Sequence, residues 1–329
     1  MAKTRVGVIR GGRGAEYDVS LKTGSQILCT LPENKYLPID VLITKDGLLH
    51  IFGVPIYPEQ LGDYIDVAFI ALHGEYGEDG GIQAFLDELR LPYTGSGKVA
   101  SALSMNKDAT KKILKDAGVN VPYGVLIQNK NDTQEGAKFI FNKISPPWVI
   151  KPNDRGSSIG LSLARNFTEL LQGIENCFTY TDTVLVEEYI RGKEATCGVI
   201  DNFRRENLYS LMPIEVIRTD HLHILTYNDK YSGKYSGLCP GRFSNEQNIE
   251  LQKLARDIHN TMGLKHYSRS DFVVTDGGGI YALEVNALPG LTEDSPLPQG
   301  LLAVGSTLSY FIDHLVELAL SEKRGIMSK

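Results

Sequence analysis

The sequence predicts a mixed α/β and α+β protein, with a parallel-sheet domain at the N-terminus and a less regular second part. Short apolar strands alternate with helical stretches through the first hundred residues, and this rhythm changes from Asn106 onward. At 329 residues the chain is also too long for one typical domain. We therefore expect two or three compact units.

The first unit is defined by alternating elements. Strands are predicted at Arg5–Arg10, Ile39–Thr44 and Val67–Leu72, with helices at Val19–Leu28 and Ile82–Leu89. Such a β-α-β rhythm implies a parallel sheet that binds ligands at the carboxyl ends of its strands. His73 follows the third strand directly and should lie at that edge.

The rest of the chain divides into two smaller patterns. The central one has helices at Lys107–Ala117 and Thr168–Phe178 and strands at Trp148–Lys151 and Val184–Tyr189. The last begins near Gly192, with strands at Leu208–Met212, Ser270–Val274 and Ile280–Val285 and helices at Asn248–Met262 and Leu301–Ser321. Within this last pattern, Tyr227–Gly241 is a long polar loop, and such loops are often functional.

Composition excludes several classes of protein. A net charge of −6 argues against binding of nucleic acid or of an anionic membrane surface. The four cysteines form no C-x-x-C pair, so neither a zinc site nor a disulfide framework is indicated. No signal peptide or membrane-length apolar run is present, and we expect a cytoplasmic enzyme.

The sequence matches neither of two common phosphate-binding loop motifs. Gly12-Arg13-Gly14-Ala15-Glu16-Tyr17 follows a strand but carries Tyr17 at the third glycine of G-x-G-x-x-G. Gly97-Lys98 lacks the earlier glycine of a Walker A loop and is followed by Val99. Any nucleotide must be bound in another way.

Oxygen donors near the C-terminus suggest a metal site. Glu284 and Asn286 point to the same face of one predicted strand, and Asp271 lies on another. If the two strands are neighbours, the three donors converge, and such hard ligands suit Mg²⁺. The alternative is that they are ordinary edge or solvent-facing residues, although they interrupt apolar neighbours.

Two further segments each allow two interpretations. Lys151 is followed by a Gly/Ser loop, residues 153–160, which could cradle a phosphate or form a plain hairpin turn. Glu16 stands in a glycine-rich turn before a helix, where it could bind a ligand or simply cap the helix.

Taken in order, several segments resemble the D-alanine–D-alanine ligase family of the ATP-grasp superfamily, nearly end to end. They are EYDVSL (16–21), HGEYGEDG (73–80), LPYTGSG (91–97), ALSMNK (102–107), KP with GSS (151–158), EEYI (187–190), RSDF (269–272), and LEVN with PG (283–290). The resemblance implies a Rossmann-like N-terminal α/β substrate domain (1–105) and a two-part ATP-grasp fold, with a central lid (106–190) and a C-terminal catalytic domain (191–329).

The resemblance also implies roles for matching positions on the nucleotide side. Lys107, Lys151 and Lys230 would contact ATP phosphates, and Glu194 the ribose. Glu187 and the backbone of Tyr189 and Ile190 would hold the adenine, and Glu188 would belong to the same nucleotide-binding segment. Magnesium ions, with Mn²⁺ as a substitute, would be held by Asp271, Glu284 and Asn286.

On the amino-acid side, Glu16 with Ser157 and Tyr231 would orient the first ammonium group, and His73 would lie beside it. Arg269 and the Gly290 backbone N–H would stabilise the tetrahedral intermediate. Ser295 would bind the second substrate's carboxylate.

The implied activity is ATP-dependent ligation of two D-alanines through an acyl phosphate, for peptidoglycan synthesis, by a homodimer. Departures occur at Arg13-Gly14, Ile224, Asp229 and the acidic stretch 292–296, which leaves D-serine or another acceptor open. Lys230-Tyr231 favours an amine over a hydroxy-acid nucleophile. A non-catalytic nucleotide-binding protein is the remaining alternative, but no matched metal ligand is lost.

Overall fold

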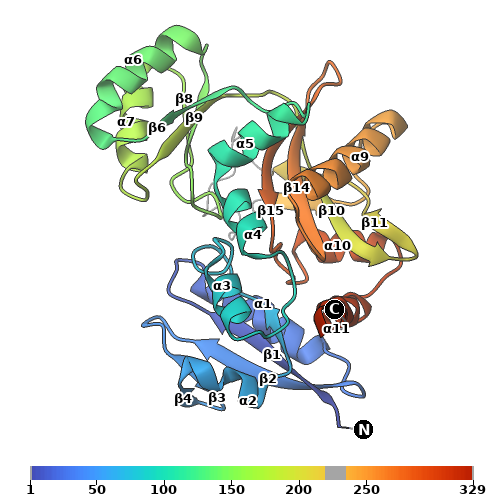
Figure 1. Ribbon diagram of the computed structural model, residues 1–329. Helices are drawn as coiled ribbons and strands as arrows, with labels where there is room; N and C mark the ends of the chain where they lie inside the picture. Colours follow the sequence, from blue (N-terminus) through green and yellow to red (C-terminus); the bar gives the residue numbers. More distant parts are fainter. Residues whose placement is uncertain (1, 219–234, 328–329) are drawn as a thin grey trace.

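Three β-sheets organise the residues described by this computed structural model, which are 2–218 and 235–327. In Figure 1 the N-terminal sheet lies at the bottom, the central sheet at the upper left and the C-terminal sheet at the upper right. The C-terminal helix returns toward the N-terminal sheet, so the two ends of the chain lie in the same half of the molecule.

The N-terminal sheet has the strand order β4-β3-β2-β1-β5. Its unit contains β1 (Thr4–Gly11), α1 (Tyr17–Thr30), β2 (Tyr36–Ile43), β3 (Leu49–Ile51), β4 (Val54–Ile56), α2 (Leu61–Tyr64), β5 (Val67–Ile70), α3 (Gly81–Glu88) and α4 (Lys98–Met105). β1 pairs in parallel with β2 and β5, which confirms the predicted parallel core. β3 and β4 extend it as antiparallel edge strands that the sequence did not predict.

The central sheet is antiparallel, in the order β6-β9-β7-β8. This part of the chain contains α5 (Lys107–Asp116), β6 (Gly124–Ile127), α6 (Thr133–Lys143), β7 (Trp148–Pro152), β8 (Ser162–Ala164), α7 (Phe167–Cys177) and β9 (Val184–Glu188). Figure 1 shows α6 and α7 together on one side of the sheet, where Ile140, Trp148 and Leu170 form a buried cluster. These helices cover that side, and Lys151 of β7 and Glu187 of β9 line a cavity.

The C-terminal sheet follows the order β13-β12-β10-β14-β15, and β11 also pairs with β10. Its unit contains β10 (Lys193–Phe203), β11 (Glu206–Ser210), β12 (Ile214–Arg218), β13 (Tyr235–Leu238), α9 (Asn245–Thr261), β14 (Tyr267–Val274), β15 (Ile280–Asn286), α10 (Pro296–Ala303) and α11 (Leu308–Met327). Antiparallel pairing of β14 with β15 confirms that the predicted metal-ligand strands are neighbours.

The last helix packs against the first sheet. Phe311, Ile312 and Leu315 of α11 belong to the same buried cluster as Val67 and Ile70 of β5. Burial of this apolar surface stabilises the packing of the C-terminal helix on the N-terminal sheet. The N-terminal unit is therefore held to the rest of the molecule by a packed interface.

The prediction of one helix over Leu301–Ser321 is wrong, because the segment forms two helices. α10 ends at Ala303 and α11 begins at Leu308, with their axes bent by 106°. Gly305 lies between them with φ of 68°, a left-handed conformation that suits glycine and stops a helix. Within residues 2–218 and 235–327, no single helix is long and apolar enough to span a membrane.

Candidate active site

One cavity of about 780 Å³ collects predicted site residues from all parts of the chain. Every predicted site residue that the structure describes lines it: Glu16, His73, Lys107, Lys151, Ser157, Glu187, Glu188, Tyr189, Ile190, Glu194, Arg269, Asp271, Glu284, Asn286, Gly290 and Ser295. The N-terminal, central and C-terminal units all contribute, so the cavity exists only in the folded arrangement of the three.

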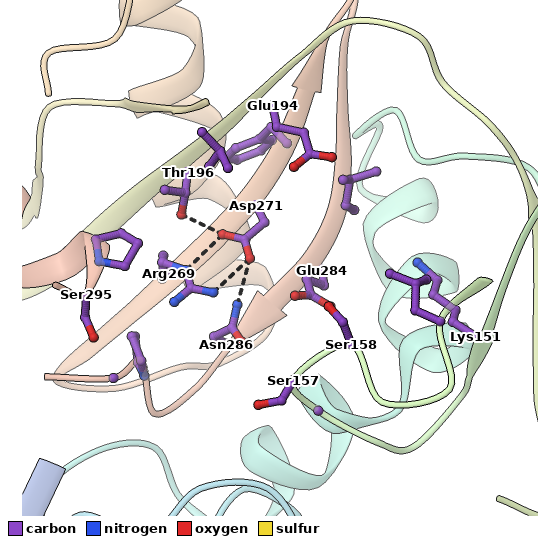
Figure 2. A pocket seen from close by; sticks show the side chains of 18 of the residues that line it. Lys151, Ser157, Ser158, Glu194, Thr196, Arg269, Asp271, Glu284, Asn286 and Ser295 are labelled. Carbon is purple, nitrogen blue, oxygen red and sulfur yellow. Dashed lines mark hydrogen bonds and ion pairs between the residues drawn. The ribbon is translucent and has the colours of Figure 1, made fainter. Parts of the chain in front are cut away.

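Two neighbouring strands build the acidic end of the cavity. Asp271 of β14 lies opposite Glu284 of β15, and the register shifts directly after this pair because Leu283 is an extra residue. Such a β-bulge re-aims consecutive side chains, and both Leu283 and Glu284 line the cavity. Asn286 lies two residues further along β15, so the three predicted oxygen donors come together (Figure 2).

Asp271 is held by several hydrogen-bond donors, shown in Figure 2. Arg269 donates through Nε to Oδ1 and through Nη2 to Oδ2, each at 2.9 Å. Thr196 Oγ1 donates to Oδ1 at 2.5 Å, and Asn286 Nδ2 donates to Oδ2 at 3.2 Å. This network fixes the carboxylate in one orientation, and it includes Thr196, which the sequence did not single out.

The Gly/Ser loop after β7 meets the N-terminal unit at the cavity. Ser157 and Ser158 have φ of 50° and 58°, a conformation that non-glycine residues rarely adopt. Ser157 Oγ donates to Glu16 Oε1. The predicted association of Glu16 with Ser157 is therefore present, and strained backbone of this kind is typical of ligand-binding loops.

A second contact joins the same loop to the N-terminal unit. Arg155 Nη1 forms an ion pair with Glu75 Oε2 at 2.5 Å, across two units of the molecule. Lys107 Nζ donates to the backbone carbonyl of Arg155 at 2.6 Å. Burial lowers the pKa of Lys107 from its ordinary value, and the carbonyl is the partner that this buried ammonium needs.

The cationic end of the cavity surrounds one carboxylate. Lys151 of β7 forms an ion pair with Glu187 Oε2 at 2.7 Å, and Lys111 of α5 forms one with Glu187 Oε1 at 2.8 Å. All three side chains are almost fully buried. The sequence did not predict a role for Lys111, although it lies four residues after Lys107 on the same helix face.

The segment after β9 forms the wall next to these lysines. Tyr189 N–H donates to the backbone carbonyl of Pro147 at 3.1 Å, and Glu188 Oε1 accepts from Tyr123 N–H at 2.8 Å. Ile190 follows and also lines the cavity, and Glu194 lines it from β10. The Glu188 side chain therefore anchors this wall to the segment beside it.

Two titratable groups lie where the N-terminal unit meets the cavity. His73 Nε2 is 2.9 Å from Thr23 Oγ1, and burial lowers its pKa to about 4. Glu78 Oε2 accepts from Gly74 N–H at 3.0 Å. Burial, reinforced by the nearby Glu16 carboxylate, raises the pKa of Glu78 to about 8. Glu78 belongs to the motif HGEYGEDG, but its raised pKa becomes apparent only from its burial in the structure.

Comparison with known proteins identifies the family. Residues 113–317 match the model of the D-ala D-ala ligase C-terminus, and residues 53–96 match that of the D-ala D-ala ligase N-terminus. A D-alanine–D-alanine ligase of Pelotomaculum thermopropionicum is 36% identical over 321 residues, covering 96% of each chain. The chain belongs to the D-alanine–D-alanine ligase family.

Solved structures similar to this family member include two whose own substrate or ligand is known. A D-Ala:D-Ser ligase, VanG, from Enterococcus faecalis has a TM-score of 0.86 at 28% identity and covers 97% of this chain and 100% of its own. A D-alanine–D-alanine ligase from Bacillus anthracis, complexed with ATP, has a TM-score of 0.78 at 28% identity, covering 98% and 99%. The expected ATP-grasp fold is thereby confirmed.

In this D-alanine–D-alanine ligase family member, the far end of the cavity is formed by the segment before α10. Ser295 is the residue at the N-terminus of α10, and its Oγ lies 2.8 Å from Thr292 Oγ1. A Cβ atom at Gly290 would approach Ser295 Oγ to 3.1 Å, which is a tight contact. Glu293 and Asp294 are exposed, so solvent screens their charges, although Asp294 also lines the cavity.

Two predicted site residues of this ligase family member are not placed. Lys230 and Tyr231 lie outside the described residues, as does part of the predicted loop Tyr227–Gly241. The prediction of a loop is wrong for the described part, because β13 (Tyr235–Leu238) pairs with β12 there. The roles of Lys230 and Tyr231 stay predictions.

Proposed function

We propose that this protein joins two molecules of D-alanine into D-alanyl-D-alanine, converting ATP to ADP and phosphate, and so serves peptidoglycan synthesis. The observation that carries the proposal is the cavity. It combines clustered oxygen donors, buried lysines and the Glu16–Ser157 pair in one space. The names of relatives that match almost the whole chain support the same reaction.

Lysines and the wall after β9 would bind the nucleotide. Lys107 and Lys151 lie at one end of the cavity and supply positive charge for ATP phosphates. The segment Glu187–Ile190 would border the adenine, and Glu194 of β10 would accept hydrogen bonds from the ribose. Positioning and charge compensation dominate phosphoryl transfer, and these residues provide both.

The donor set fits magnesium, with Mn²⁺ as a substitute. Asp271 and Glu284 provide carboxylates, and Asn286 turns its amide nitrogen to Asp271, which leaves its amide oxygen for a cation. Mg²⁺ is usually held by one or two carboxylates together with phosphate oxygens, so this small set is sufficient. When bound, the ions offset charge on the transferring phosphoryl group.

The first amino acid would lie between Glu16 and Arg269. Glu16, oriented by Ser157, would accept hydrogen bonds from the ammonium group. His73 is neutral at pH 7 because burial depresses its pKa to about 4, so it adds no charge beside that group. The substrate carboxylate would then face the phosphate of ATP and become an acyl phosphate.

Attack by the second amine creates a tetrahedral oxyanion, which needs donors aimed at it. Arg269 and Gly290 both line the cavity, as does Ser295, and the Arg269 guanidinium and the Gly290 N–H would be those donors. Ser295 would donate to the carboxylate of the second substrate. Lys230 and Tyr231 would close over the site and exclude water, which would otherwise hydrolyse the acyl phosphate.

The finer points of assembly belong to the same proposal. We infer three units, 1–105, 106–190 and 191–329, in a homodimer that acts in the cytoplasm. ATP consumption and D-alanine as a free substrate both fit that compartment.

Phosphate release tests the proposed function. The protein is mixed with ATP, Mg²⁺ and single D- or L-amino acids, and products are identified by mass. D-alanine should give phosphate and D-alanyl-D-alanine in equal amounts. Absence of phosphate release and of dipeptide with every amino acid of the panel would instead leave the chain as a nucleotide-binding protein without ligase activity.

A further inference from the structure

Helix α5 buries two lysines on one face. Its buried residues are Lys107, Thr110, Lys111 and Leu114, which recur at helical spacing. The adjacent Lys112 points away, with 73% of its side chain exposed. An inward-facing lysine is costly unless something compensates its charge, so Lys111 requires an explanation.

The explanation lies in a shared carboxylate. Glu187 forms one ion pair with Lys111 at 2.8 Å through Oε1 and another with Lys151 at 2.7 Å through Oε2. The side chains of Lys111, Lys151 and Glu187 are 9%, 11% and 2% exposed. Water therefore screens these charges weakly, so each lysine depends on Glu187 and the carboxylate depends on both lysines.

The electrostatics of the three groups agree with that dependence. Burial alone would raise the pKa of Glu187, but Lys111 and Lys151 outweigh it and hold that pKa below its ordinary value. Burial lowers the pKa of Lys111 to about 8, which still leaves it protonated at pH 7. The carboxylate thus stays ionised because two cations face it.

Position distinguishes the two lysines. Lys151 and Glu187 line the cavity, whereas Lys111 is not among its lining residues and reaches Glu187 from α5. A phosphate in the cavity would therefore give Lys151 a second anionic partner. Glu187 would then depend on Lys111 to remain paired and in place.

We propose that Lys111 is a positioning residue: it fixes and neutralises Glu187 and so releases Lys151 for the nucleotide phosphates. This role rests on the proposed binding of ATP in the cavity. Without Lys111, the Glu187 carboxylate would have Lys151 as its only remaining partner in this triad and would compete with the phosphates for it. Nucleotide affinity should fall, while the distant amino-acid sites should keep theirs.

Direct binding is the first test. Lys111→Gln removes the charge but retains a donor for Glu187, and Lys112→Gln is the matched control on the exposed face of the same helix. Titration calorimetry with the non-hydrolysable analogue β,γ-imido-ATP and Mg²⁺ should show about tenfold weaker binding for Lys111→Gln. Lys112→Gln should bind as the unchanged protein does. Equal affinity in Lys111→Gln and the unchanged protein would overturn the proposal.

A second variant distinguishes the effect of the Lys111 charge from the effect of its packing. Lys111→Arg keeps the cation, so its nucleotide Kd should stay within about threefold of the unchanged protein, even if Lys111→Gln does not fold. An equally large loss in both variants would show that packing, not charge, is what Lys111 provides. In steady-state assays, Lys111→Gln should raise the KM for ATP with little change in the KM for D-alanine.

A double-variant cycle tests the link through Glu187. In a Glu187→Gln background there is no carboxylate to neutralise, so Lys111→Gln should have much less effect on nucleotide affinity. Additive effects would contradict the proposed route. Failure of the proposed function looks different, because the unchanged protein would then bind no nucleotide or form no dipeptide.

Discussion

Asp271 accepts four hydrogen bonds, two from Arg269 and one each from Thr196 and Asn286. Glu284 lies opposite it on the neighbouring strand. Asp271 is therefore part of the local structure as well as a candidate ligand, and its replacement would disturb more than one function. Glu284 offers a second carboxylate at which to test metal binding.

Glu284→Gln should lower kcat by about a hundredfold or more, because an amide cannot replace a carboxylate that offsets the charge on metal ions and phosphate. Asp271→Asn should be equally severe. Asp276→Asn, in the exposed turn between β14 and β15, is the matched control. Near-normal dipeptide formation by Glu284→Gln at limiting Mg²⁺ would falsify the metal assignment.

Glu78 predicts a pH dependence of stability. Its pKa rises from an ordinary 4.5 to about 8 in the folded protein, owing to burial, Glu16 and, more weakly, Glu284. Between these values the folded state holds a proton that the unfolded state has lost, so stability falls as pH rises through this window. Glu78→Gln removes the titration and should gain thermal stability relative to the unchanged protein as pH rises.

The measurement is the difference in Tm between Glu78→Gln and the unchanged protein, from about pH 5 to about pH 8. The amide oxygen introduced by this substitution can still accept a hydrogen bond from Gly74 N–H, so the comparison isolates the charge. A difference in Tm that stays constant across this range would mean that Glu78 titrates normally.

Ser295 makes a kinetic prediction at the far end of the cavity. Loss of its hydroxyl in Ser295→Ala should raise the KM for the acceptor amino acid far more than that for ATP, because one donor to the carboxylate is lost. Ser321→Ala, at an exposed position of α11, is the control. Equal changes in the two KM values would place the second carboxylate elsewhere.

Sequence motifs identified many of the residues that line the cavity. They missed Lys111 and Thr196, whose contacts form only in the folded protein. Lys111 and Thr196 belong to no loop or glycine signature, and nothing in their sequence surroundings shows that they face a carboxylate. Their roles appear only when α5 and β10 are packed against β9 and β14. Long-range contacts of this kind leave no local pattern in one sequence.

At the scale of elements, the spacing of apolar residues predicted helices and strands best where only one face of the element is buried. The predicted helix Lys107–Ala117 is observed as α5, Lys107–Asp116, with its N-terminus capped by Asn106. By contrast, β10 was missed: residues 195–200 are continuously buried, so the strand shows no alternation of polar and apolar residues. The short edge strands β3 and β4 were also too brief to give a pattern.

The break between α10 and α11 gives a stability prediction. Gly305 has φ of 68° and open space where a side chain would begin, so Gly305→Ala should destabilise through backbone strain alone, by about 1 kcal/mol. Gly277→Ala is the control, since Gly277 also has open space but not a positive φ. Urea unfolding measures both. An equal effect of the two substitutions would remove strain as the reason for the break.

At the scale of the whole molecule, the cavity depends on how the units are placed. The Gly/Ser loop reaches Glu16 through Ser157, Arg155 reaches Glu75, and α11 closes the chain onto the N-terminal sheet. The sequence predicted residues that line the cavity, through their resemblance to the family motifs. The contacts between units could not be predicted, because they join positions far apart in the chain.

In the proposed reaction, the acceptor would bind at the end of the cavity that Ser295 lines. The sequence left the acceptor open at the acidic segment 292–296, and a D-Ala:D-Ser ligase is among the structures similar to this chain. Glu293 and Asp294 are exposed, so solvent weakens the repulsion between their charges and a carboxylate in the cavity. Asp294 nevertheless lines the cavity, so an acceptor with a cationic or hydroxyl-bearing side chain has to be compared with D-alanine directly.

The most direct test is a one-pot competition. The protein is given ATP, Mg²⁺ and equal concentrations of D-alanine, D-serine and D-lysine, and the dipeptides are quantified by mass. D-alanyl-D-alanine should be the dominant product. Dominance of D-alanyl-D-serine or D-alanyl-D-lysine would contradict the assignment of D-alanine as acceptor, and formation of no dipeptide at all would contradict ligase activity itself.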